Sequence, residues 1–235
     1  MKLGIMQPYF LPYIGYFQLI AAVDKFVLLD DVNYINRGWI NRNRIAVGGE
    51  SHWLTVPLNG AGQNRLIKEI EIVSDEAWKL KMRRTVQGEY ASAPCFKEVF
   101  PLFEETLAKA QGNLSLFLHR SLRIILDYLG LGTPIEPTSA IYPKHGLKGQ
   151  ERILDICMKE SASIYINPPG GRGLYDQSLF AARGVQLLFL DPNLEGLHLR
   201  HSGLDGPVLS ILDVLMLNPP EAVAQSAGAF KLVPF

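Results

Sequence analysis

The sequence predicts a Rossmann-like α/β fold, with a mostly parallel sheet, an antiparallel strand addition and a helical insertion. An apolar run at residues 3–6, a helix-like segment at 16–23 and a buried run at 25–31 follow one another closely. Strand, helix and strand within about 30 residues is typical of a parallel βαβ unit. After residue 130 strand-like and helix-like segments alternate again, and between the two regions lies a mainly helical stretch at about 74–130.

The elements follow in order along the chain. The first strand ends at Gln7-Pro8, where a loop begins. Three hairpin-like strands are expected at residues 44–47, 53–58 and 67–73, because glycine-containing segments separate them. In the last of these, isoleucines partly alternate with charged residues, as expected for a strand with one face in water. These strands form the expected antiparallel addition.

Helical periodicity begins after Ser74, a candidate N-cap followed by two carboxylates. One helix is expected to stop near Pro94, a second near residue 110, and a third covers 113–129 with apolar residues at three- and four-residue steps. The remaining elements are expected as strands at 135–141, 163–167 and 185–190 and helices at 149–160, 177–183 and 209–217. No repeat or linker divides the chain, so residues 1–235 are expected to form one domain.

Composition excludes several classes of protein. The chain has 235 residues, 48% hydrophobic and 20% charged, which is ordinary for a globular protein. Lys plus Arg (23) equals Asp plus Glu (23), so the chain has no net positive charge with which to bind nucleic acid or an anionic membrane surface. No run approaches the roughly 20 apolar residues of a membrane span, and no signal-peptide core precedes Pro8. We therefore expect a cytoplasmic protein without a membrane span and without nucleic acid as a partner.

Chemistry is expected in the loops that follow the strands, because ligands of open parallel sheets bind beyond the carboxyl ends of the strands. In the first loop Gln7, Tyr9 and Tyr16 supply donors that suit a phosphate, a sugar or a nucleobase, just before a helix N-terminus. The alternative is that the tyrosines pack the first helix. Residues 13–16 also have the spacing of the His-x-Gly-His element of nucleotidyl-transfer enzymes, but tyrosine cannot carry an imidazolium charge.

The second loop begins with Asp30 and Asp31 and continues into an Asn- and Arg-rich segment at residues 36–44. Arginine matches phosphate or carboxylate bidentately, so Asn41 and Arg42 are predicted to bind substrate. The alternative is a solvated loop whose aspartates neutralise its arginines. Asp30 is a candidate base, and paired carboxylates also suit Mg²⁺. No third oxygen ligand is evident from the spacing, so no metal ligand is assigned and no cofactor is identified.

The third loop precedes the predicted helix at 149–160. Lys144 offers a positive charge there, and His145 can move a proton near neutral pH. His145 is therefore the second catalytic candidate.

The fourth loop follows the predicted strand at 163–167 and is rich in glycine. It resembles a phosphate cradle, although it matches neither a P-loop nor G-x-G-x-x-G. Glycine-rich turns are also common without function. The substrate-binding candidates in this loop are Gly170, Gly171, Arg172, Tyr175 and Asp176.

These loops carry a resemblance to a known family. The segments QPYFLPYIGY, NRGWINRNRI with the following WLTVP, ERILDIC leading to YINPPGGRGLYD, and LSILD together resemble the WbqC-like family over nearly the whole chain. The resemblance implies a bacterial cytoplasmic protein, often encoded among enzymes that build surface polysaccharides such as O-antigen. It brings no agreed reaction and no established catalytic residue.

Three functions are considered. The first is a transferase that acts on a nucleotide-activated sugar or transfers a small activated group, with a phosphate- or carboxylate-bearing small molecule as substrate. The second is a non-catalytic protein that binds a sugar nucleotide or assists assembly with the same pocket. The third is a nucleotidyltransferase-like enzyme. The sequence does not fix the oligomeric state, and a homo-oligomer is left open.

Overall fold

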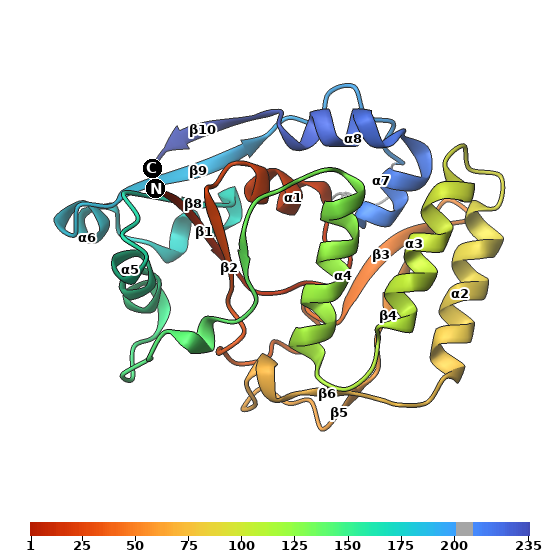
Figure 1. Ribbon diagram of the computed structural model, residues 1–235, viewed down its shortest axis with the longest axis horizontal. Coiled ribbons are helices and arrows are strands. Elements are labelled where there is room, and N and C mark those ends of the chain that lie inside the picture. The colour runs from red at the N-terminus through yellow and green to blue at the C-terminus, as the bar shows by residue number, and fades with distance from the viewer. Residues whose placement is uncertain (201–208) are drawn as a thin grey trace.

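The computed structural model describes residues 1–200 and 209–235. A six-stranded sheet in the order β10-β9-β8-β1-β2-β7 forms its centre (Figure 1). All neighbouring strands are parallel except β10, which runs antiparallel to β9. This topology confirms the predicted Rossmann-like, mostly parallel sheet. Its strands are β1 (Lys2–Met6), β2 (Lys25–Leu28), β7 (Ile135–Glu136), β8 (Ile164–Asn167), β9 (Gln186–Pro192) and β10 (Phe230–Pro234).

Helices cover both faces of the sheet because side chains alternate along each strand. Leu3 and Ile5 of β1 face a core shared with α5 (Gly149–Lys159) and α6 (Gln177–Ala182). Gly4 points to the opposite face, where an added Cβ would stand 2.9 Å from the ring of Phe26. That face is covered by α1 (Ile14–Ala21), which packs against α8 (Pro220–Ala227).

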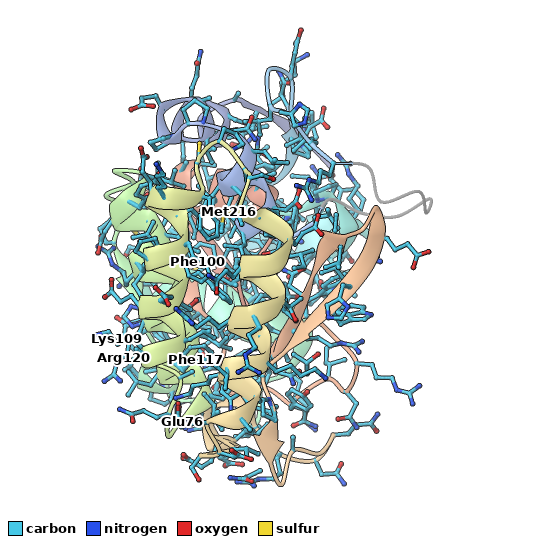
Figure 2. The ribbon with its side chains drawn as sticks, turned by 90° about the vertical axis from the view of Figure 1, so that its right-hand side faces the viewer. Glu76, Phe100, Lys109, Phe117, Arg120 and Met216 are labelled. Carbon is cyan, nitrogen blue, oxygen red and sulfur yellow. The ribbon has the colours of Figure 1, made fainter. Side chains whose placement is uncertain are left out.

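The helical insertion consists of α2 (Ala77–Tyr90), α3 (Phe96–Ala108) and α4 (Leu114–Tyr128). In Figure 2 Phe100, Phe117 and Met216 point into the interior of this part, whereas Glu76, Lys109 and Arg120 lie at its outer surface. Met216 belongs to α7 (Ile211–Leu217), which packs against α3.

Two short hairpins make the antiparallel addition. β3 (Arg42–Val47) pairs with β4 (Glu50–Thr55), and β5 (Leu58–Asn59) pairs with β6 (Glu71–Ile72). Gly48 and Gly49 form the first turn with φ of 59° and 85°, a conformation that favours glycine. The hairpin β3–β4 stands beside α2 (Figure 2).

Several predicted boundaries are wrong. The strand expected at residues 67–73 is a 3-10 turn, η1 (Ile67–Glu69), before the short β6, because the amides of Ile67 and Lys68 donate to the carbonyls of Val32 and Asp30 in the loop after β2. Ser74 is not an N-cap; instead the Asp75 carboxylate accepts from the amide of Ala77 at 2.8 Å.

The strand expected at residues 135–141 is also shorter than predicted. It ends at Glu136 and gives way to the turn η2 (Ser139–Ile141), whose first residues are capped by the Thr138 hydroxyl. Neither α8 nor β10 was predicted. Alanine-rich α8 has no broad apolar stripe, and β10 is recognisable only through its pairing with β9.

Candidate functional site

The strand order reverses between β1 and β8. β1 leads through α1 to β2 on one side, whereas β8 leads through α6 to β9 on the other, and α1 and α6 cover opposite faces. In open α/β sheets ligands bind at such a switch point, beyond the carboxyl ends of the strands. The loops that begin at Gln7 and Pro168 flank this place, and the loops after β2 and β7 lie along the same edge.

The loop after β1 is anchored by Tyr16. The Tyr16 hydroxyl donates to the backbone carbonyl of Gln7 at 2.9 Å, and its ring is fully buried. Tyr16 therefore packs α1, as the alternative interpretation of the sequence proposes, and its hydroxyl is already engaged. The nucleotidyltransferase alternative needs a free group here that donates a hydrogen bond to a phosphate. The Tyr16 hydroxyl already donates to Gln7, so this contact does not favour that alternative.

Tyr9 lies half-buried beside Tyr16, with ring centroids 5.7 Å apart. Burial, and to a smaller extent Tyr13, raises the pKa of Tyr9 to about 12. Its hydroxyl is therefore a neutral hydrogen-bond donor at physiological pH. Neither this hydroxyl nor the half-exposed Gln7 amide makes a hydrogen bond within the described parts of the chain, so both can contact a ligand.

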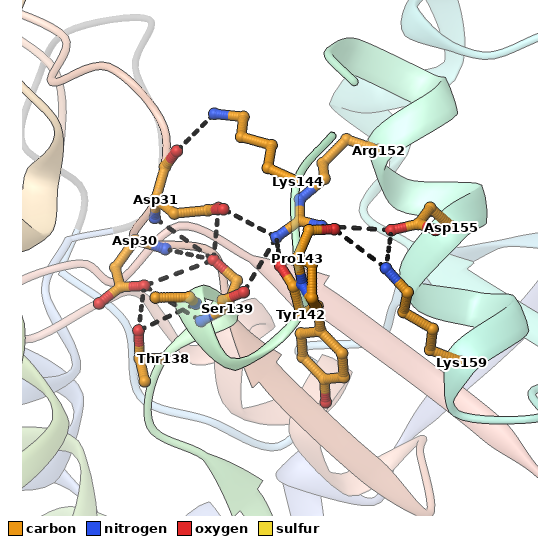
Figure 3. A network of polar contacts seen from close by, with 11 residues as sticks. Asp30, Asp31, Thr138, Ser139, Tyr142, Pro143, Lys144, Arg152, Asp155 and Lys159 are labelled. Carbon is orange, nitrogen blue, oxygen red and sulfur yellow. Dashed lines mark hydrogen bonds and ion pairs between the residues drawn. The ribbon is translucent and has the colours of Figure 1, made fainter. Parts of the chain in front are cut away.

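Asp30 and Asp31 lie at the end of β2 in the polar network of Figure 3. One Asp30 oxygen accepts from the Thr138 hydroxyl at 2.7 Å and the Ser139 amide at 3.1 Å, and the other accepts from the Ser115 hydroxyl at 2.7 Å. Asp31 accepts from the Ser139 hydroxyl at 2.6 Å. Asp30 is 2% exposed, so these donors satisfy a carboxylate that water does not reach.

Arg152 of α5 completes this network from the opposite side. Its Nη2 donates to Asp31 at 2.7 Å and to the carbonyls of Ser139 and Tyr142 at 2.9 and 2.8 Å. Its Nη1 lies 3.3 Å from Asp155, which also binds Lys159 at 2.8 Å. The guanidinium thus ties the end of β2, the turn η2 and α5 together (Figure 3).

Sequence reasoning missed Arg152, although a signal was present. Arg152 lies four residues before Ile156, on the same stripe of α5 as apolar residues, and the helix buries that stripe. A charged residue on a buried stripe indicates a buried ion pair.

Lys144 and His145 lie in the loop between η2 and α5. Lys144 Nζ donates to the backbone carbonyl of Asp31 at 2.7 Å, so the second and third predicted loops do come together. The turn continues with His145 at φ 46° and Gly146 at φ 78°, and the His145 side chain is exposed. His145 is therefore presented to solvent on a loop that is fixed to the end of β2.

Asn41 and Arg42 lie at the start of the hairpin β3–β4 instead. Asn41 is buried, accepts from the Tyr34 hydroxyl at 2.7 Å and donates to the carbonyl of Val56 at 2.8 Å. The Arg42 guanidinium stacks 4.0 Å from the centroid of Trp53. Both contacts organise the hairpin itself.

The hairpin is nonetheless joined to the loop after β1. The amide of Phe10 donates to the carbonyl of Ile40 at 3.0 Å, and Asn43 Nδ2 donates to the carbonyl of Leu11 at 2.8 Å. The first loop and the Asn- and Arg-rich segment therefore form one unit.

The fourth loop forms the 3-10 turn η3 (Pro169–Leu174), in which Gly170 is exposed and Gly171 is buried. Arg172 turns toward β9 and β10, lying 4.7 Å from the Phe189 ring and donating to the carbonyl of Pro234 at 3.3 Å. Tyr175 packs on Tyr165 with their hydroxyls 3.0 Å apart.

Asp176 accepts from the amide and hydroxyl of Ser178 at 2.8 and 2.6 Å and so caps α6. The hydrogen bonds from Ser178 lower the pKa of Asp176. No described contact joins the side chains of Arg172 or Asp176 to the network around Asp31. The fourth loop is joined to α5 through its backbone, because the amide of Asp176 donates to the Gln150 side chain at 2.9 Å.

Two surface hollows lie away from these residues. One, of about 290 Å³, lies between α2 and α3 beside Arg83 and Glu104. Another, of about 470 Å³, lies where the end of β9 meets the start of β10, beside Asp191 and Lys231. Neither is lined by a predicted site residue.

Comparison with known proteins decides the family. The model of the WbqC-like protein family matches residues 7–225. The chain belongs to the WbqC-like protein family. A curated relative, the "uncharacterized protein Rv1507c" of Mycobacterium tuberculosis, is 31% identical over 226 residues, which cover 94% of this chain and 95% of the relative. No solved structure shows significant similarity to this chain.

Two further observations concern the described residues, 1–200 and 209–235. Within them no helix has the length and apolar character needed to cross a membrane. Within them, too, no three His, Cys, Asp or Glu side chains gather in a group that could hold a metal ion. Cys157 is fully buried in α5, and burial raises the pKa of its thiol to about 12, so it belongs to the core.

Proposed function

We propose that this chain is a transferase that acts on a nucleotide-activated sugar, or transfers a small activated group, in the assembly of a bacterial surface polysaccharide such as O-antigen. The observation that carries the proposal is the attachment of the Lys144–His145 loop to the end of β2, at the sheet edge that contains the switch point. A cation and an imidazole on a loop that is held to the end of β2 support general acid–base catalysis, which needs its groups positioned by their surroundings. The proposed place of action is the cytoplasm.

Five of the residues predicted from the sequence have roles in this proposal. Gln7 and Tyr9 offer their open donors to the substrate, and Lys144 holds phosphate or carboxylate. His145 accepts the proton of the attacking hydroxyl or amine as that group bonds to the transferred group. The bond between the transferred group and its activating group breaks, and the activating group leaves with the electron pair. Asp30 positions η2 rather than acting as the base, because both of its oxygens already accept hydrogen bonds. No role in this proposal is assigned to the other substrate-binding residues predicted from the sequence, which are Tyr16, Asn41, Arg42, Gly170, Gly171, Arg172, Tyr175 and Asp176.

Thermal-shift screening against nucleotides, sugar nucleotides and acyl-carrier thioesters tests the substrate class. A ligand of the folded protein at 100 times its dissociation constant adds roughly 2.7 kcal/mol of stability. Each ligand that stabilises the protein is then incubated with candidate acceptors, and products are sought by mass spectrometry. The proposal is overturned if ligands bind and no combination of them is ever converted.

The variant His145→Asn tests the proposed base. We expect kcat to fall by about 100- to 10,000-fold while the dissociation constant of the donor is unchanged. His52→Asn is the matched control, because His52 is likewise exposed but lies on β4. Equal turnover in the two variants would remove His145 from the mechanism.

A non-catalytic binding protein is the second candidate. The carboxylates of Asp30 and Asp31 accept hydrogen bonds from Ser139 and are buried, so Asp30 is not free to act as a base. Of the two predicted catalytic residues only His145 is exposed, and a site with so few free catalytic groups favours binding without turnover. In this case His145→Asn leaves the affinity for the ligand unchanged and wild-type protein shows no turnover with any acceptor.

A further inference from the structure

The outer face of the hairpin β3–β4 carries a ladder of arginine and tryptophan. The register pairs Arg44 with Trp53, and Arg42 lies two residues away on the same face. Trp39, from the preceding turn, adds a second indole with its ring centroid 5.4 Å from that of Trp53. We refer to Trp39, Arg42, Arg44 and Trp53 as the hairpin ladder.

Both guanidinium groups lie against the indoles. Arg42 Cζ is 4.0 Å from the centroid of Trp53, and Arg44 Cζ is 5.3 and 5.4 Å from the centroids of Trp39 and Trp53. Such cation–π contacts hold the arginines in place while the edges of the guanidinium groups keep their donors. Trp53 remains 38% exposed, so the ladder is open to solvent.

The two arginines differ in what they bind. Arg42 donates from Nε to the carbonyl of Gly38 at 3.1 Å and from Nη2 to the carbonyl of Arg37, and so it fastens the preceding turn. Arg44 has a buried Nε with no hydrogen-bond partner among the described residues. Ser51 Oγ, close by on the same face of β4, is a second buried polar atom of this kind.

No ion pair between described residues involves Arg37, Arg42 or Arg44. A buried donor without a partner is costly and rare, and a cluster of unpaired guanidinium groups attracts an anion. Among residues 1–200 and 209–235 no carboxylate pairs with the ladder, which favours a negatively charged ligand there.

We infer that the hairpin ladder binds a nucleoside diphosphate, with the base stacked on the exposed indole and the diphosphate held by Arg44 with Arg42 beside it. Aromatic rings and guanidinium planes both stack on nucleobases, and the guanidinium edge matches phosphate oxygens. This inference rests on the proposed function, since it assigns the nucleotide half of the activated sugar to the hairpin. The strand that carries the ladder is joined to the loop after β1 by the Ile40 carbonyl and by the Asn43 side chain, which lies on the face opposite the ladder.

Tryptophan fluorescence gives a direct test. The chain has three tryptophans, and the third, Trp78, belongs to α2 and donates to the carbonyl of Val73. The Trp78→Phe variant therefore reports only on the ladder. Titration of this variant with the 5′-diphosphates of uridine, thymidine, guanosine, adenosine and cytidine is expected to quench its fluorescence for at least one of them.

The affinity of the quenching nucleotide is then compared between variants. Arg44→Gln and Trp53→Leu, each in the Trp78→Phe background, are expected to weaken binding about 5- to 100-fold. Arg84→Gln is the control, because Arg84 is an exposed arginine of α2. Thermal unfolding of each variant verifies that it is folded, and Trp53→Phe, which keeps an aromatic ring, is expected to retain most of the affinity.

Four results would overturn the inference. The first two are that no nucleoside diphosphate quenches the fluorescence, and that Arg44→Gln and Arg84→Gln bind the nucleotide with equal affinity. The third is that inorganic pyrophosphate binds as tightly as the nucleoside diphosphate. The fourth is that glucuronic acid 1-phosphate, which carries two acidic groups and no base, binds more tightly than the nucleoside diphosphate. If the ladder has only a structural role, Arg44→Gln will have a lower melting temperature than the parent protein and the same dissociation constant for the nucleotide.

Failure of this inference and failure of the proposed function can be told apart. Nucleotide binding that depends on Arg44, with no turnover of any sugar nucleotide, retains the inference and rejects the transferase. Turnover that is lost in His145→Asn and unchanged in Arg44→Gln retains the transferase and rejects the ladder as the nucleotide site.

Discussion

The guanidinium of Arg152 and the carboxylate of Asp31 form a buried ion pair with Nη2 and Oδ2 2.7 Å apart and side-chain exposures of 2% and 6%. The pair joins α5 to the end of β2, which are 121 residues apart in the sequence. Taking two charges out of water is costly, and the cost is met only while both partners and their further hydrogen bonds are present. Removal of one partner therefore affects the whole sheet edge.

Arg152→Met is expected to lower the free energy of unfolding by about 3–5 kcal/mol, because it leaves the charge of Asp31 buried and uncompensated. Urea denaturation measures this change. The matched control is Arg123→Met, which removes an exposed pair with Asp127 on α4 and should cost less than about 1 kcal/mol. Asp31→Asn added to Arg152→Met should recover part of the loss; if it deepens the loss, the charge is not its cause.

Gly171 lies against the side chain of Asn167 at the end of β8. An added Cβ would stand 1.8 Å from Asn167 Nδ2, and Asn167 also accepts from the buried Tyr165 hydroxyl at 3.0 Å. Gly171→Ala is therefore expected to displace Asn167 and cost about 1–3 kcal/mol of stability. Gly170→Ala is the control, because its Cβ would meet nothing within 4 Å. Equal melting temperatures for the two variants would contradict this account.

Much of the fold was predictable from local patterns. The βαβ unit at the N-terminus follows from two short apolar runs around a helix-like segment, because strands of a parallel sheet are buried on both faces. The helices of the insertion follow from their period of 3.6 residues, which reflects one buried face. The turn η1 was not predictable, because distant backbone carbonyls at Val32 and Asp30 take the amides that a strand would have used. β10 was missed for a similar reason, since its identity depends on pairing with β9.

The candidate site was predictable only in part. Asp31 and Lys144 were recognised because each lies among polar residues in a loop that follows a predicted strand. The two residues are in contact, since Lys144 donates to the Asp31 carbonyl. The side-chain partners could not be predicted, because a hydrogen bond between Arg152 and Asp31 depends on how α5 docks on the sheet. The same limit applies to Arg42, whose stacking on Trp53 follows from the register of the hairpin.

Asn41 is expected to support the hairpin rather than to contact substrate. Asn41→Ala leaves the Tyr34 hydroxyl and the Val56 carbonyl without their partner in a site that is 7% exposed at Asn41. We expect a loss of about 1–3 kcal/mol in the free energy of unfolding. Asn59→Ala, which removes one bond at an exposed position of β5, should cost less. A raised KM with unchanged stability in Asn41→Ala would show direct contact with substrate.

Glu160 makes the stability of the protein depend on pH in the acid range. Burial by itself raises the pKa of its carboxyl, but hydrogen bonds from Lys25 at 2.7 Å and the Tyr142 hydroxyl at 2.5 Å outweigh burial, and the pKa lies below the usual 4.5. The unfolded chain therefore binds a proton more readily than the folded chain. The stabilisation from Glu160 is complete above the unfolded-state pKa and is lost as the pH falls through the lower folded-state value.

Glu160→Gln is expected to destabilise the protein at pH 7, and its difference from wild type should shrink as the pH falls below the usual glutamate pKa, since the wild-type carboxyl then becomes neutral as well. Urea denaturation at a series of pH values from about 7 to 3 measures this difference. Glu105→Gln is the control, because Glu105 is exposed and its oxygen lies 4.0 Å from Lys109 Nζ, so its difference should stay small at every pH. A Glu160→Gln difference that is constant or grows toward acid pH would mean that the carboxyl is not held in its charged form by Lys25 and Tyr142.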